Sequence, residues 1–136
     1  MAMKKAEIKN SMLPSLGFPW ALHISEVTQW LFVSGIPPMD EAGKVVSKGD
    51  VVGQFQYEMA RIKEILMEAG MKLEDIVSLT ITVTEKADLY GEWGKFSEAY
   101  LRYFPDTPVP AGGALRIVSG LSHPKMLIEI EAIAAK

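Results

Sequence analysis

Within residues 75–85, DIVSLTITVTE, apolar and polar side chains alternate strictly from Val77 to Thr84. This alternation predicts a β-strand, because successive side chains of a strand point to opposite faces of its sheet. One face of the strand carries aliphatic side chains, and the other carries serine and threonine hydroxyls. We therefore expect a sheet with one face against a core and a second face that is polar but uncharged at this strand.

Two amphipathic helices are expected to cover the apolar face. From Val52 to Ala69, apolar residues recur at steps of four and three with charged residues between them, which is the spacing of an amphipathic helix. Asp50 is its expected N-cap, and Gly70 is well placed to end it. Residues 88–104 carry a similar stripe of aromatic and apolar residues, which ends at the prolines of FPDTPVP.

The remaining signals complete a small α+β domain. Residues 1–20 contain prolines and a glycine without apolar periodicity, so we expect an irregular lead-in. The order β, β, α, β, α, β, β predicts a single sheet with two helices on one face, and the length of 136 residues fits a single domain over 1–136. Further strand signals lie at 23–35, as a hairpin around Thr28 and Gln29, at 113–119 and at 125–134.

The last strand gives the second face of the sheet a mixed character. Leu127, Glu129, Glu131 and Ile133 share one strand parity, opposite to the apolar set that starts at Met126. Such a face is too apolar for bulk water and too polar for a dry core. Association with other copies of the chain through this face would resolve the conflict.

Composition excludes several classes of function. The chain has no cysteine, and its histidines, His23 and His123, are a hundred residues apart, so we expect neither a metal site nor a cofactor. A net charge of −3 with scattered basic residues makes nucleic-acid binding an unlikely function. The chain has neither an h-region nor a run of apolar residues long enough to cross a membrane, so we expect a cytoplasmic protein.

Four segments resemble the signature segments of a known family. LFVSGIPPMD, MEAGMKLEDIVSLTITVTE, YLRYFPDTPVPA and LIEIEAIA occur in order at near-normal spacing. They are similar to those of the Rid (YjgF) family, whose members are also labelled L-PSP endoribonucleases. The resemblance covers roughly residues 20–134, nearly the whole chain.

The resemblance implies a fold, an assembly and a reaction. The family fold is similar to the chorismate mutase of the bacterial trimeric type, in which three sheets form a central barrel. A small-molecule ligand would bind in a cleft at each subunit interface of the homotrimer. Active members of the family hydrolyse enamines and imines such as 2-aminoacrylate to a keto acid and ammonia.

Carried over by motif, the resemblance gives candidate site residues. The first glutamate of the EIEA motif is Glu129, expected to orient water, and the glycine of VSG is Gly35. The substrate-anchoring arginine that follows PA in the family is replaced by Gly112, and the position two residues later is Ala114. The family's tyrosine falls on Ala21, beside Trp20, which is the best candidate for a cleft wall.

The residues themselves leave alternatives open at three places. Arg116 shares the parity of Gly112 but lies about 13 Å along the strand, so pairing with Glu129 or Glu131 is favoured over a role as replacement anchor. Gly112 and Gly113 are interpreted either as a turn or bulge or as an enlarged cleft with accessible backbone N–H groups. His123 is interpreted as a turn residue in preference to a proton shuttle.

Together these observations predict a deaminase-like hydrolase that acts on a small enamine, imine or related nitrogen compound. Because the anchoring arginine is absent, we expect poor activity on 2-aminoacrylate. The alternative is a trimer that binds or senses a small ligand without catalysis. Ribonuclease activity is the weakest of the three hypotheses, since the net charge offers little attraction for phosphate.

Overall fold

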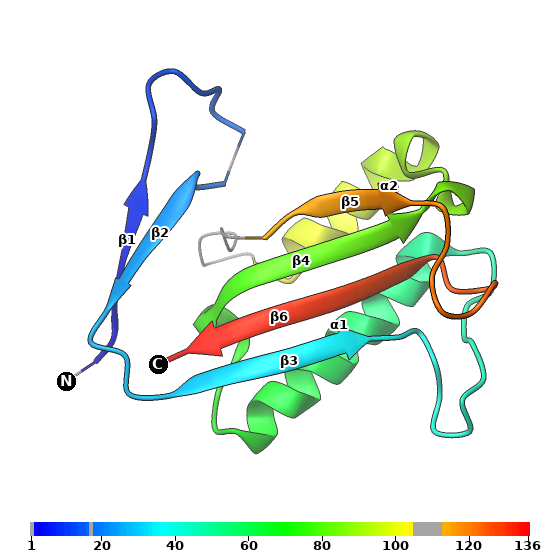
Figure 1. Ribbon diagram of the computed structural model, residues 1–136, viewed down its shortest axis with the longest axis horizontal. Helices are drawn as coiled ribbons and strands as arrows, with labels where there is room; N and C mark the ends of the chain where they lie inside the picture. Colours follow the sequence, from blue (N-terminus) through cyan, green and yellow to red (C-terminus); the bar gives the residue numbers. More distant parts are fainter. Residues whose placement is uncertain (1, 17, 105–112) are drawn as a thin grey trace.

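The computed structural model describes residues 2–16, 18–104 and 113–136. A four-stranded sheet carries two long helices on one face, and a separate two-stranded sheet stands beside it (Figure 1). The α+β class with both helices on one face is confirmed. The strands are β1 (Lys4–Ile8), β2 (Ala21–Ser25), β3 (Trp30–Ile36), β4 (Ile76–Thr84), β5 (Leu115–Val118) and β6 (Ile128–Ala135), and the α-helices are α1 (Val51–Glu68) and α2 (Leu89–Arg102).

The main sheet has the order β3-β6-β4-β5. β6 pairs antiparallel with both β3 and β4, whereas β5 runs parallel to β4. The parallel pair requires a crossover connection, and α2 lies in it. β6 therefore lies in the middle of the sheet, with its side chains fixed on both faces by its neighbours.

The core lies between the helices and one face of the sheet. The fully buried side chains of α1 include Phe55, Met59, Ile62 and Leu66, the apolar stripe expected from the sequence. They pack against alternate residues of β4 and β6, such as Val83 and Ile130, in one buried cluster. Asp50 caps α1 as predicted, because its side chain accepts a hydrogen bond from the backbone N–H of Gly53 at 3.0 Å.

Two expectations about the N-terminal part of the chain are wrong. Residues 1–20 are not irregular throughout, because β1 forms there and pairs antiparallel with β2. β1 is exposed along its whole length, so its sequence has no alternating apolar residues from which a strand could be predicted. The hairpin expected around Thr28 and Gln29 does not form, because β3 pairs with β6 instead and both of those N–H groups donate to the carbonyl of Lys136.

No helix in the described ranges is long and apolar enough to cross a membrane.

Candidate functional site

The face of the sheet away from the helices carries the candidate site. Thr82 of β4 is paired with Arg116 of β5 on one side and with Glu129 of β6 on the other. Because paired residues of neighbouring strands point to the same face, these three side chains form a row across the sheet. The expected common face of Arg116 and Glu129 is thus found.

Gly35 brings β3 against the same carboxylate. The pairing of β3 with β6 shifts by one residue between Val33 and Ile36, which is a β-bulge. A Cβ atom at Gly35 would lie 2.8 Å from Cδ of Glu129 and 3.0 Å from each carboxylate oxygen. Any side chain at position 35 would displace the Glu129 carboxylate, so this arrangement requires glycine. The structure thus brings together two residues that were predicted from the sequence.

Gln54 of α1 forms hydrogen bonds to the backbone just before the strand that carries Glu129, on the helix side of the sheet. The Oε1 of Gln54 accepts the backbone N–H of Leu127 at 2.8 Å, and its Nε2 donates to the carbonyl of Lys125 at 3.1 Å. Gln54 is completely buried. This role of Gln54 was not predicted from the sequence, although an amide within the apolar stripe of a helix was a signal for it.

Glu58, one turn further along α1, was also missed. Its side chain is completely buried, and neither of its carboxyl oxygens has a hydrogen-bond partner among the described residues. Burial, with a smaller contribution from the negative charge of Glu129, raises its pKa from 4.5 to about 10. The nearby backbone N–H of Ile130 opposes this shift. Glu58 therefore carries a proton at neutral pH.

Gly113 lies where β5 approaches β4. A Cβ at Gly113 would collide with the carbonyl oxygen of Leu79, and the carbonyl of the next residue, Ala114, accepts the N–H of Ile81 at 2.8 Å. This close packing of backbone against backbone supports the interpretation of Gly113 as a turn or bulge residue at the start of the strand. Gly112 lies outside the described residues.

Arg116 and Trp20 come from different parts of the fold, because Arg116 is in β5 and Trp20 directly precedes β2. Arg116 is exposed, and none of the ion pairs within the described ranges involves it, so the expected pairing with Glu129 or Glu131 is not present. Trp20 packs edge-on against Phe18 at 5.1 Å and donates its Nε1–H to the carbonyl of Pro14 at 3.0 Å. Its ring and hydrogen-bond contacts therefore lie within the N-terminal segment.

His123 occupies the turn before β6. Its Nδ1 accepts the backbone N–H of Lys125 at 3.0 Å. This bond favours the interpretation of His123 as a turn residue.

A depression of about 300 Å³ hollows the same open face beside the Glu129 row. It is not centred on Glu129 but on the next row of the sheet. Its lining residues are Phe32, Val33, Ser34, Ser78, Thr80, Glu131, Ala132 and Ile133. Beside it, Trp30 and Phe32 stack with ring centroids 6.2 Å apart while remaining 54% and 71% exposed, so apolar area on this face lacks cover within one chain.

Gly35→Ala tests whether the position of the Glu129 carboxylate matters. The added methyl group meets the end of a flexible side chain rather than backbone, so we expect Glu129 to move while the free energy of unfolding changes by less than about 1 kcal/mol. Any activity that depends on Glu129 should fall by roughly 10-fold or more, since reacting groups tolerate little displacement. Gly120→Ala is the matched control because a methyl group there meets no atom within 4 Å. Equal activity of the two variants would contradict the assignment.

Gly113→Ala tests the close approach of β5 to β4. The methyl group would collide with the Leu79 carbonyl, which can be relieved only by displacing backbone. We expect the free energy of unfolding to fall by about 2 kcal/mol or more in urea denaturation. Gly94→Ala, where the methyl group meets open space on α2, should instead raise the free energy of unfolding by about 0.5–1 kcal/mol. A Gly113→Ala variant as stable as the wild type would refute this packing.

Chemically, the row offers one carboxylate, one hydroxyl and one guanidinium that forms no ion pair within the described ranges. A carboxylate can take a proton from water, and a guanidinium can bind an anionic group. Fold and site together define a class of small α+β proteins in which the sheet face not covered by helices carries a carboxylate, a hydroxyl and a guanidinium.

The sequence profile of the family described as Endoribonuclease L-PSP matches residues 18–136. The chain therefore belongs to this family, also known as the Rid or YjgF family, as the four segments indicated.

Relatives and solved structures agree with this assignment. The chain is 36% identical over 104 residues to the 3-aminoacrylate deaminase RutC of Acinetobacter baylyi, which covers 76% of this chain and 77% of RutC. It is 41% identical over 113 residues to a RutC family protein of Pyrococcus abyssi, covering 82% of each. Among solved structures, YyfB of Yersinia pestis, a Rid family protein of unknown function, superposes with a TM-score of 0.83 at 26% identity over 100% of both chains. The YjgF gene product of E. coli gives a TM-score of 0.66 at 26% identity, covering 82% of this chain and 86% of that one.

Proposed function

We propose that this protein is a hydrolytic deaminase of small enamines or imines that carry a carboxylate, with Glu129 as its general base. The observation that carries the proposal is the contact of the Glu129 carboxylate with Gly35, on the same face as Arg116. The similarity to a 3-aminoacrylate deaminase supports it, because that compound is an enamine with a carboxylate. Family membership alone leaves the substrate open.

In this proposal the candidate residues have defined tasks. Hydrolysis replaces the C–N bond of the substrate by a C=O bond, which requires water at the carbon that bears nitrogen. Glu129 takes the proton of that water, and Gly35 leaves the space for its carboxylate. Arg116 binds the substrate carboxylate in place of the absent family arginine, while Gly112, Gly113 and Ala114 shape the cleft beside it, and Trp20 forms a wall of the cleft.

The site is proposed to be complete only in a homotrimer. The open face carries the exposed rings of Trp30 and Phe32, and no second layer covers them within the described part of the chain. Packing three such faces together buries these rings and encloses the cleft against water. Light scattering of the purified protein at micromolar concentration should give three times the mass of the 15.0 kDa chain.

A comparison of two enamines tests the proposed specificity. We expect faster ammonia release from 3-aminoacrylate, generated by hydrolysis of its N-carbamoyl derivative, than from 2-aminoacrylate, generated by a serine dehydratase. Gly112→Arg should raise the rate on 2-aminoacrylate by about 10-fold or more, since a bidentate arginine would again hold that carboxylate. Rapid hydrolysis of 2-aminoacrylate by the wild type would contradict the importance of the replaced arginine.

A further inference from the structure

The side-chain amide of Gln54 joins two segments that are far apart in the sequence. Its Oε1 accepts the backbone N–H of Leu127 at 2.8 Å, and its Nε2 donates to the carbonyl of Lys125 at 3.1 Å. The same Nε2 donates to the carbonyls of Val46 at 3.2 Å and Ser47 at 3.4 Å. An amide has two N–H groups, so one of them is shared between these neighbouring carbonyls. Gln54 therefore bridges the turn before β6 and the loop before α1.

The loop side of this bridge leads to Gly35. After β3 the chain doubles back, and the N–H of Val46 donates to the carbonyl of Pro38 at 2.8 Å. Pro38 is fully buried and comes three residues after Gly35. The hydrogen bond from Gln54 to Val46 thus holds the end of β3 that carries Gly35.

The other side of the bridge leads to Glu129. Leu127 directly precedes β6 and comes two residues before Glu129. Its N–H is bound to Gln54, and its carbonyl accepts the N–H of Thr84 at 2.9 Å. Leu127 is thereby fixed to both the helix and the sheet. Gln54 therefore holds the two segments that meet where the Glu129 carboxylate contacts Gly35.

The burial of Gln54 is explained by these hydrogen bonds. The residue lies in the apolar stripe of α1, next to Phe55, and is 0% exposed. A buried amide is tolerated where its polar atoms have partners, and both polar atoms of Gln54 have them. An apolar side chain could fill this place in the stripe, but it could not fix one backbone segment against another.

We propose that Gln54 is a positioning residue for the Glu129 carboxylate: its bridge fixes β6 relative to the end of β3, so that the carboxylate stays against Gly35. This inference rests on the proposed enamine hydrolysis. Gln54 lies on the helix side of the sheet, so it acts on the reaction only through the backbone that carries Glu129 and Gly35. A displacement of about 1 Å at a reacting group can cost about 100-fold in rate, so small shifts of β6 matter.

Nuclear Overhauser effects test the positioning without any substrate. The wild-type protein should show a cross-peak between the Hα protons of Gly35 and the side-chain protons of Glu129, because the carboxylate lies directly over this glycine. Gln54→Met keeps the length of the side chain and none of its hydrogen bonds, so the cross-peak should weaken or vanish. An unchanged cross-peak in folded Gln54→Met would overturn the proposal.

Kinetics tests whether this position matters for the reaction. In Gln54→Met, kcat for enamine hydrolysis should fall by about 10-fold or more while KM stays within about threefold, since Arg116 lies on β5 and is not held by the bridge. In the Glu129→Gln background the same substitution should change kcat by less than about twofold, because no carboxylate is left to displace. A residue needed only for stability would lower kcat by the same factor in both backgrounds, and that result would refute the positioning role.

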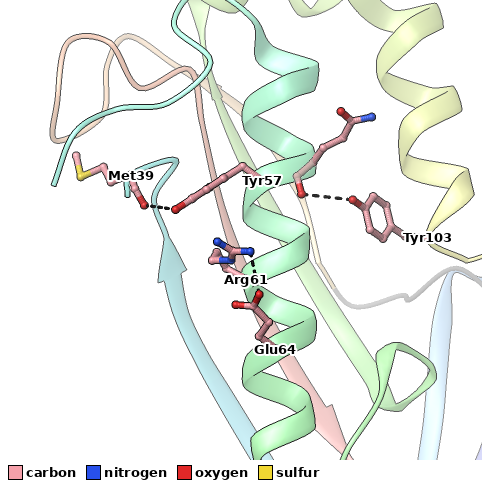
Figure 2. Close-up of polar contacts among 6 residues, drawn as sticks. Met39, Tyr57, Arg61, Glu64 and Tyr103 are labelled. Carbon is pink, nitrogen blue, oxygen red and sulfur yellow. Dashed lines mark hydrogen bonds and ion pairs between the residues drawn. The ribbon is translucent and has the colours of Figure 1, made fainter. Parts of the chain in front are cut away.

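Tyr57 offers a matched control on the same helix. Its Oη donates to the carbonyl of Met39 at 2.8 Å, so it holds the same loop, but it makes no hydrogen bond to β6 within the described ranges (Figure 2). Tyr57→Phe removes this bond and keeps the ring on which Arg61 lies. We expect the cross-peak to remain and kcat to stay within about twofold of the wild type. A loss equal to that of Gln54→Met would show that attachment of the loop matters and not the bridge.

The two proposals can fail separately. If the wild-type protein hydrolyses no enamine, the deaminase proposal falls, and the cross-peak alone decides whether Gln54 positions Glu129. If Gln54→Met does not fold, Gln54→Glu takes its place. A carboxyl keeps an acceptor for Leu127 but donates at most one hydrogen bond, so the bridge is weakened and both the cross-peak and kcat should fall. A wild-type cross-peak and kcat in Gln54→Glu would then overturn the inference.

Discussion

Glu129→Gln is expected to lower kcat/KM for ammonia release from the preferred enamine by about 100-fold or more, the usual effect of removing a general base. The amide keeps the size of the side chain next to Gly35 but cannot take a proton from water. Because Glu129 is only partly buried and makes no ion pair within the described ranges, the fold should be unaffected. Steady-state ammonia assays and thermal unfolding, measured side by side, separate the two effects.

The same strand offers a matched control for this prediction. Glu131 lies two residues further along β6 and faces the same side, but it pairs with Thr80 instead of Thr82 and lines the depression. Glu131→Gln should retain activity within a fewfold of the wild type. If both variants lose activity equally, the general charge of this face matters and not the carboxylate beside Gly35.

Glu58→Gln is expected to make the protein markedly more stable in alkaline solution. The pKa of Glu58 is raised from 4.5 to about 10 in the folded state, so between these values unfolding releases a proton. The wild-type free energy of unfolding therefore falls as pH rises, by up to about 1.4 kcal/mol per pH unit from this group. Between pH 6 and pH 9 the wild type should lose up to about 4 kcal/mol relative to Glu58→Gln.

Urea denaturation at several pH values measures this difference directly. The variant's stability curve should be flatter than that of the wild type, and the gap between them should widen with pH until Glu58 ionises in the folded protein. Glu68→Gln, which changes an exposed carboxylate on α1, corrects for the altered net charge. Parallel curves for the wild type and Glu58→Gln would show that Glu58 is already ionised in the folded state.

Periodicity in the sequence was sufficient for the layers of the fold. The alternation in 75–85 and the stripe from Val52 to Ala69 each have one apolar face, and burying both faces leaves few arrangements. The family motifs then pointed to Gly35 and Glu129, which the structure brings into contact. Both signals are local, since each depends on residues close together in the chain.

The features that were missed depend on pairing and on burial. β1 has no buried face, so its residues show no alternation of apolar and polar side chains that would predict a strand. The hairpin between residues 23 and 35 was wrongly predicted because short strand signals do not show which strand will be the pairing partner. Helical periodicity predicts where apolar residues lie but gives no role to polar residues such as Gln54 and Glu58. From the sequence alone, Glu58 would be expected to be an exposed charge on the helix surface. Only the register of β6 over α1 shows that one of them is fully hydrogen-bonded and the other is not.

Ammonia release from 3-aminoacrylate, measured with and without the wild-type protein at matched pH, is the most direct test of the account. We expect a rate above the spontaneous hydrolysis that is proportional to protein, saturates with substrate and is abolished in Glu129→Gln. Saturable binding of a stable enamine analogue without any protein-dependent ammonia would contradict the account and identify a ligand-binding member of the family.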